Sequence, residues 1–248
     1  MDPQIIYESK NFIAVNKPAG LLVHKTAVSK QKEKTLVDFI LGKYPEVKNV
    51  GDDKENRPGI VHRLDKDTSG IIIIARNQKY FEYLKNLFQT KKVRKNYLAL
   101  VWGKVKLPIG EKGIINKPIS LKPGTTKRTV YGGKMTKEAI TEYKALKFYK
   151  FQKNKEEKSL TLVEVSPLTG RTHQIRVHMA AIGHPVVGDT LYGGKRFLNL
   201  SKEYFGLDRQ FLHAQSLEFP PESGRKMKLE FELPKSLKNI LDGLESNY

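Results

Sequence analysis

A charged loop runs directly into a strand at residues 62–74, where the sequence reads HRLDKDTSGIIII. The β-branched run Ile71–Ile74 is typical of a strand that is buried on both faces. Seven of the nine residues before it, 62–70, are polar or ionisable. Ordinary connections rarely gather such side chains ahead of a buried strand, so either this loop carries chemistry or Asp67 and Ser69 only cap a turn.

Predicted strands outnumber predicted helices on both sides of this loop. Apolar periodicity predicts a helix that is capped by Thr35 and ends near Lys43, and a second helix over 78–90. A third helix is predicted from Thr172, as its N-cap, to Gly183. Strand-like stretches lie at 4–7, 12–16, 21–23, 71–74, 93–101, 140–151, 159–166, 211–219 and 226–233. The predicted fold class is α+β, with a mixed, mainly antiparallel central sheet flanked by helices and loops.

The whole chain, residues 1–248, is predicted to form a single domain. Its 248 residues, of which 39% are hydrophobic, suffice for a substantial core. No internal repeat or long low-complexity stretch interrupts it, and Gly and Pro are spread along the chain rather than gathered in one linker.

Charge points to a polyanionic partner. The chain has 45 Lys and Arg against 26 Asp and Glu, which gives a net charge of +19. Solubility alone is the alternative explanation. A membrane surface would favour a basic amphipathic helix, whereas the Lys clusters here lie in loop-like segments, so nucleic acid is the better polyanion.

Several classes of site are excluded by composition. The absence of Cys excludes disulfides, thiol nucleophiles and Cys-type zinc sites, and the six His residues do not have HxxxH or HExxH spacing. Neither a GxxxxGK[ST] loop nor a GxGxxG turn is present, which argues against a phosphate-handling enzyme. We expect no metal, no cofactor, no membrane segment and a cytoplasmic location.

The loop at 62–70 resembles the motif of the RluA-type pseudouridine synthases, in which the Asp of H-R-L-D is catalytic. Further segments match the other motifs of that family in order: NKPAGLLVH at 16–24, KNYLALVWG at 95–103, EAITEY at 138–143, LTGRTHQIRVHMAAIGHPVVGD at 168–189 and FLHA at 211–214. The resemblance implies the pseudouridine synthase fold and an isomerase. Its substrate would be uridines in structured RNA, either large-subunit ribosomal RNA, transfer RNA or both.

The resemblance also implies three catalytic residues, Asp65, Tyr97 and Arg176. Asp65 matches the essential carboxylate, which acts either as a nucleophile or as the base that removes a sugar C2′ proton, and both roles stay open. Tyr97 matches the tyrosine that stacks on the uracil and helps to remove the C5 proton. Arg176 matches the arginine that pairs with the catalytic carboxylate and keeps it ionised.

Substrate binding is predicted for His62, Arg63, Lys17, Arg171 and His173. The family's equivalent of Arg63 holds RNA after the target nucleotide is flipped out, as it must be for the carboxylate to reach it. Arg171 is a second candidate for pairing with the carboxylate or for contacting phosphate. Lys17 is expected to position the loops, and His173 to make structural hydrogen bonds.

Many members of the family carry a small N-terminal RNA-binding domain, but only 15 residues precede Asn16 here. We therefore expect a catalytic domain alone, which acts as a monomer on RNA without an obligate protein partner. The Lys-rich segments 25–34, 91–95 and 122–137 would then grip the RNA. A non-catalytic RNA-binding protein of the same fold is the alternative, but it leaves the joint presence of Asp65, Tyr97 and Arg176 unexplained.

Overall fold

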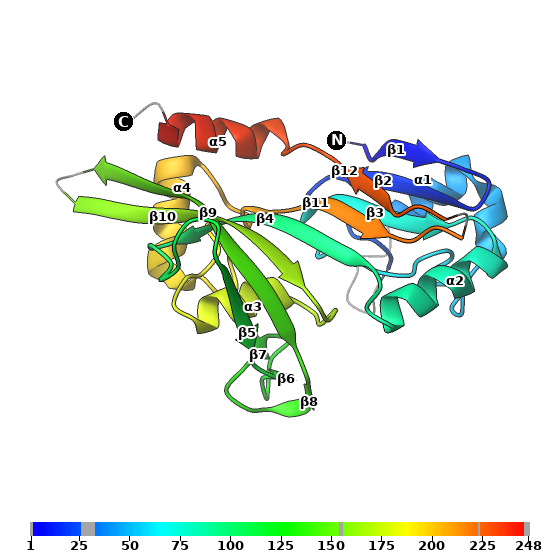
Figure 1. Ribbon diagram of the computed structural model, residues 1–248, viewed down its shortest axis with the longest axis horizontal. Helices are drawn as coiled ribbons and strands as arrows, with labels where there is room; N and C mark the ends of the chain where they lie inside the picture. Colours follow the sequence, from blue (N-terminus) through cyan, green and yellow to red (C-terminus); the bar gives the residue numbers. More distant parts are fainter. Residues whose placement is uncertain (1, 26–32, 154–155, 223, 246–248) are drawn as a thin grey trace. The chain divides into compact units, whose positions relative to one another are not determined.

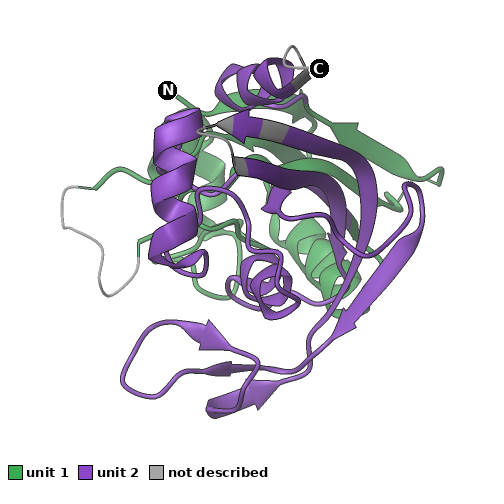
Figure 2. Cartoon of the chain, turned by 90° about the vertical axis from the view of Figure 1, so that its left-hand side faces the viewer, with its two compact units in different colours: residues 1–94, 214–231 green, residues 95–213, 232–248 purple. Residues whose placement is uncertain are grey.

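The computed structural model describes residues 2–25, 33–153, 156–222 and 224–245 (Figure 1). The chain divides into two compact units, coloured green and purple in Figure 2. Unit 1 comprises residues 1–94 and 214–231, and unit 2 comprises residues 95–213 and 232–248. The single domain expected from the sequence stays a prediction.

Unit 1 is built on antiparallel strands. Strands β1 (Gln4–Glu8), β2 (Phe12–Lys17) and β3 (Ser69–Ala75) pair in that order. Strand β11 (Leu212–Phe219), whose residues from Ala214 on belong to unit 1, follows β3 in the strand order and pairs with β12 (Met227–Glu230). The helices of unit 1 are α1 (Leu36–Lys43), the 3₁₀ helix η1 (Pro45–Asn49) and α2 (Gln78–Gln89).

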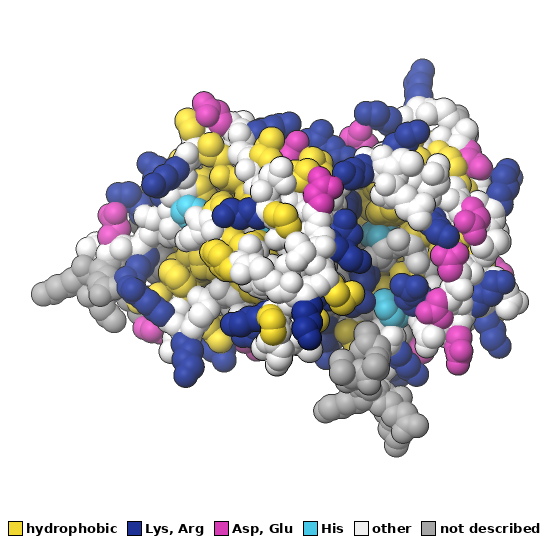
Figure 3. Space-filling model, turned by 90° about the horizontal axis from the view of Figure 1, so that it is seen from below, with side chains coloured by type: hydrophobic (Ala, Val, Ile, Leu, Met, Phe, Trp, Pro, Cys, Tyr) yellow, Lys and Arg dark blue, Asp and Glu magenta, His cyan; other side chains and the backbone are white. Residues whose placement is uncertain are grey.

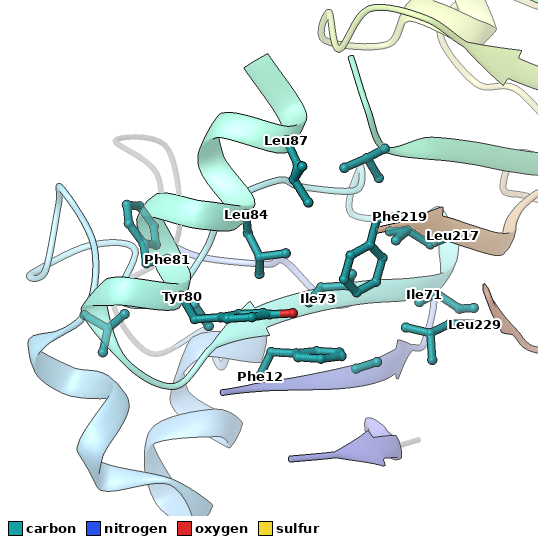
Figure 4. Close-up of a cluster of buried hydrophobic side chains, with 14 residues drawn as sticks. Phe12, Ile71, Ile73, Tyr80, Phe81, Leu84, Leu87, Leu217, Phe219 and Leu229 are labelled. Atoms are coloured by element: carbon teal, nitrogen blue, oxygen red, sulfur yellow. The ribbon is translucent and has the colours of Figure 1, made fainter. Parts of the chain in front are cut away.

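The four isoleucines of β3 divide between two cores, because successive side chains of a strand point to opposite faces. Ile71 and Ile73 pack in a cluster with Phe12, Tyr80, Leu84 and Phe219, drawn in Figure 4. Ile72 and Ile74 pack in a second cluster with Val15, Leu36 and Ile40. The prediction of a strand buried on both faces is confirmed, and the charged loop that precedes β3 is therefore anchored to the most buried strand of unit 1.

Helix α1 begins as the sequence predicts. The Thr35 hydroxyl accepts a hydrogen bond from Asp38 N, and the Asp38 carboxylate accepts one from Thr35 N. This reciprocal arrangement is a capping box with Asp in place of the more common Glu. Helix α2 has Asn77 as its N-cap, which accepts from Tyr80 N.

Unit 2 contains a second group of antiparallel strands. The order is β4 (Arg94–Trp102), β10 (Glu156–Pro167), β9 (Ile140–Lys153) and β5 (Lys112–Asn116). A separate small sheet of β7 (Arg128–Thr129), β6 (Ile119–Leu121) and β8 (Lys134–Lys137) lies below these strands in Figure 1. The helices of unit 2 are α3 (Gln174–Ala181), α4 (Gly194–Phe205) and α5 (Lys235–Glu245). The predicted α+β class with a mainly antiparallel sheet is confirmed.

Two local predictions are wrong, and one helix was not predicted. Thr172 does not cap α3: His173 is the N-cap, in the left-handed region at φ 57°, and the Gln174 side chain accepts from Arg171 N where a capping hydroxyl was expected. Helix α4 was not predicted, because the glycines at 193 and 194 hide its start. Residues 21–23 form only an isolated bridge between Leu22 and Thr35.

Candidate active site

The loop 62–68 of unit 1 carries Asp65 with its backbone held and its side chain partly exposed. Thr68 N donates to Asp65 O at 3.2 Å, which closes a turn over Asp65. The neighbouring Leu64, Thr68 and Ser69 are buried. The carboxylate is thus placed on a fixed turn from which it can still reach a substrate.

Lys17 is fully buried beside this turn. Its Nζ donates to Pro18 O and Leu21 O, both at 2.8 Å, and to Lys66 O at 2.9 Å. Burial of an ammonium is costly unless its donors are satisfied, and these three carbonyls satisfy them. Lys17 therefore ties the 18–21 turn to the residue that follows Asp65, which is the geometry of a positioning residue. Its contact with substrate stays a prediction.

His62 fastens the start of the loop to β3. Its Nε2 accepts from Ile73 N at 2.9 Å, so the proton of the neutral ring is on Nδ1. The ring also stacks on Phe88, with 4.6 Å between centroids. Because its edge and its face both contact unit 1, His62 is placed to orient the loop. Its contact with RNA stays a prediction.

Arg63 is exposed and influences a histidine that sequence reasoning did not single out. His24 is buried, and burial first, then the charges of Arg63 and Arg57, lower its pKa to about 4. His24 is consequently neutral at physiological pH. Its place at the end of the NKPAGLLVH motif was the signal that could have identified it.

In unit 2, Lys95 and Tyr97 lie on one face of β4, as the alternation predicts. Tyr97 pairs with Val165 of β10 and is 9% exposed. The Lys95 Nζ is 3.4 Å from Thr169 O, and burial lowers the pKa of Lys95 to about 8. A lysine of this kind changes charge close to physiological pH, which the sequence did not indicate.

Arg176 is buried within α3 and forms an ion pair with Asp189. The Nε–Oδ2 and Nη2–Oδ1 distances are 2.7 and 2.9 Å, so the pair is bidentate. The ring of Tyr192 lies 5.3 Å from the guanidinium carbon. Asp189 was not a predicted site residue, although it ends the 168–189 motif. The pairing of Arg176 with Asp65 stays a prediction.

Arg171 and His173 both make local contacts in unit 2. Arg171 Nε donates to Glu138 O at 2.9 Å. His173 Nδ1 and the Tyr192 hydroxyl are 2.9 Å apart, in agreement with the hydrogen-bonding role expected for this histidine. Substrate contacts for both residues stay predictions.

Within the residues that the structure describes, no group of three or more His, Cys, Asp or Glu side chains could hold a metal ion. The same described ranges contain no helix that combines the length and apolarity required to cross a membrane.

The fold and these motifs define the chain as an RNA-modifying isomerase, and comparisons with known proteins give the family. A family model described as RNA pseudouridylate synthase matches residues 11–181. The chain belongs to this family and is an RNA pseudouridine synthase.

Relatives and solved structures agree with this assignment. An uncharacterized RNA pseudouridine synthase of Aquifex aeolicus is 41% identical over 246 residues, 98% of this chain and 73% of the relative. Ribosomal large subunit pseudouridine synthase D of Salmonella typhimurium is 33% identical over 255 residues, 98% of this chain and 71% of the relative. The solved structure of Human RNA Pseudouridylate Synthase Domain Containing 1 is 25% identical with a TM-score of 0.70, over 99% of this chain and 95% of that one.

Proposed function

We propose that this enzyme isomerises uridines in large-subunit ribosomal RNA, transfer RNA or both, with Asp65 as the essential catalytic carboxylate. The observation that carries the proposal is the placement of Asp65 on a turn that Lys17 and His62 hold, with its side chain partly exposed. Relatives from Salmonella typhimurium and Buchnera aphidicola, 33% and 36% identical, are named ribosomal large subunit pseudouridine synthase D. Ribosomal RNA is accordingly the first substrate to test, and the cytoplasm is the expected place of action.

The reaction breaks the bond between the ribose C1′ and N1 of uracil, rotates the base and joins C1′ to C5. Asp65 either attacks C1′ as uracil leaves or removes the C2′ proton to give a glycal. The C5 proton is lost in the last step, and Tyr97 is proposed to stack on the base and help to remove it. Since atoms are only rearranged, the reaction requires no redox cofactor.

Arg176 is proposed as the partner of the Asp65 carboxylate, a role for which Arg171 is the second candidate. A guanidinium stabilises the ionised carboxylate, which is the form required both of a base and of a nucleophile. Arg63 and His62 are proposed to contact RNA around the flipped nucleotide, because a base inside a duplex is out of reach of the carboxylate.

The small sheet of unit 2 is proposed to grip the RNA backbone. Residues 117–137 contain six Lys and Arg residues and no Asp or Glu. Lys122, Lys127 and Lys134 are exposed there. On the face drawn in Figure 3, Lys and Arg side chains are more frequent than Asp and Glu. Of the other Lys-rich segments, 91–95 is described, whereas residues 26–32 of segment 25–34 lie outside the described residues.

Substitution of Asp65 tests the proposal. Asp65→Asn keeps the size of the side chain but is neither a competent base nor a good nucleophile, so isomerisation should be abolished while RNA binding persists. Asp67→Asn is the matched control in the same loop. The assay is release of tritium from uridine labelled at C5, in RNA from cells that lack the gene. Substantial release by Asp65→Asn would overturn the catalytic assignment.

The target RNA is found by mapping pseudouridine in total RNA with and without the gene. Sites that disappear from large-subunit ribosomal RNA or from transfer RNA, and reappear when the purified enzyme is added, would support the proposed substrate. Loss confined to another class of RNA would refute it and leave the role of Asp65 intact.

A further inference from the structure

The carboxylate of Asp189 is held on every side. Besides the two bonds from Arg176, its Oδ1 accepts from Leu191 N at 2.8 Å and from Tyr192 N at 2.9 Å. Its own backbone carbonyl accepts from Gly193 N at 3.2 Å. A buried carboxylate with four N–H donors has both of its oxygens satisfied, and it has little room to rotate.

Tyr192 holds the same guanidinium from another direction. Its ring lies against Arg176 in a cation–π contact, and its hydroxyl is hydrogen-bonded to His173 at the start of α3. The hydroxyl also accepts from Arg128 N of β7 at 2.9 Å. Tyr192 therefore joins the ion pair to the helix that carries Arg176 and to the small basic sheet.

This arrangement fixes the direction of the Arg176 side chain. A guanidinium is planar and has five N–H donors in a rigid fork, of which Asp189 takes one on Nε and one on Nη2. When one edge of the fork is clamped and one face is covered, the opposite edge points in a single direction. An arginine that is already oriented does not have to lose side-chain freedom when the reaction takes place.

We propose that Asp189 is a positioning residue for the isomerisation, which acts by holding Arg176 in the orientation that the reacting carboxylate requires, with Tyr192 covering the guanidinium. The inference rests on the proposed pairing of Arg176 with the catalytic carboxylate and assigns Asp189 a part in it. The competing explanation is an ion pair that only stabilises unit 2. That explanation predicts a loss of stability with no specific effect on the chemical step.

The first test is Asp189→Asn, which keeps the shape but removes the charge and leaves one oxygen to accept from the fork. The single-turnover rate of tritium release should fall about 100-fold, a loss that a misplacement of about 1 Å in an active site can cause. The dissociation constant for RNA should change by less than about threefold. Asp208→Asn, at an exposed position of the same unit, is the matched control and should keep the wild-type rate.

A double-mutant cycle with Arg176→Met separates positioning from stability. If Asp189 acts through Arg176, Asp189→Asn should cost nothing further in the Arg176→Met background. The double variant Asp189→Asn with Arg176→Met removes both charges and keeps a side-chain oxygen for Leu191 N and Tyr192 N, so its rate can still be compared with that of Arg176→Met if Asp189→Asn alone folds poorly. Melting temperatures of all variants show which of them are folded.

The outcomes are distinct. An equal rate loss from Asp189→Asn in both backgrounds, or a wild-type rate together with a lower melting temperature, would overturn the positioning role. If Arg176→Met is slow but Asp189→Asn is not, the inference fails and the proposed function stands. If Arg176→Met keeps the wild-type rate, the proposed pairing with the catalytic carboxylate fails, and the inference fails with it.

Discussion

Replacing Lys17 by Met removes a buried charge while keeping an unbranched side chain of similar length. In the folded enzyme the three hydrogen bonds from Nζ to Pro18 O, Leu21 O and Lys66 O are lost. Lys66 O keeps the bond from Gly20 N at 3.0 Å, so the cost falls mainly on the other two carbonyls. Each buried carbonyl that loses its donor costs about 1–3 kcal/mol.

Loss of the donor to these two carbonyls should lower the free energy of unfolding by about 2–6 kcal/mol. The variant no longer has to bury an ammonium, which offsets part of this loss, so we expect a net decrease of about 3 kcal/mol. For a chain of this size that corresponds to a melting temperature about 6–12 °C lower. The turn after Asp65 loses its tie at the same time, so the rate of isomerisation should fall by about tenfold or more even at temperatures where the variant is folded.

Thermal denaturation followed by circular dichroism, together with single-turnover tritium release at 20 °C, measures both effects. Lys10→Met, at an exposed position of the same unit, is the control and should melt within about 1 °C of the wild type. An unchanged melting temperature for Lys17→Met would refute the argument that its three hydrogen bonds hold the loop.

Two further predictions follow from the charges of the described residues. His24 in the folded enzyme binds a proton only below about pH 4, whereas in the unfolded chain it does so below about pH 6.5. Between these pH values the unfolded chain holds more protons than the folded enzyme. The free energy of unfolding should therefore fall by about 3 kcal/mol as the pH falls from 6.5 to 4. His24→Gln should flatten this dependence in urea denaturation at pH 7 and 4.5, and an unaltered slope would contradict it. Changing Lys122, Lys127 and Lys134 together to Gln should reduce the slope of log RNA affinity against log salt concentration by about 2–3. The control is a triple Gln variant at the exposed Lys202, Lys235 and Lys238. Equal slopes for the two triple variants would contradict the proposed contact of the small sheet with RNA.

Local physics explains which parts of the fold could be predicted from sequence. Four consecutive isoleucines predict a strand buried on both faces, and the two core clusters of unit 1 confirm it. Thr35 and Asp38 form a cap between neighbours in sequence, so the start of α1 was visible as well. The start of α3 depends on a left-handed His173 and on the side chain of Gln174, and neither leaves a periodic signal.

The candidate site likewise has residues that the sequence predicts and residues that only the folded structure identifies. The family motifs predict Asp65, Tyr97 and Arg176 as catalytic residues, because each stands in a recognisable run of residues. The residues that hold them in place were harder to identify. Lys17 looks like a surface lysine until its three carbonyl acceptors are known, and Asp189 lies 13 positions from Arg176 across an irregular turn. Contacts of this kind depend on how the chain folds back, which hydrophobic periodicity does not encode.

The two buried cations differ in a way that bears on the chemistry. Lys17 donates to three backbone carbonyls, one of them the carbonyl of Lys66 next to Asp65, so it holds the turn that carries Asp65. Arg176 shares its charge with the Asp189 carboxylate, so that pair has almost no net charge and contributes mainly direction. Replacing Lys17 should therefore loosen the turn that carries Asp65, whereas Asp189→Asn should both misalign Arg176 and leave its positive charge unbalanced.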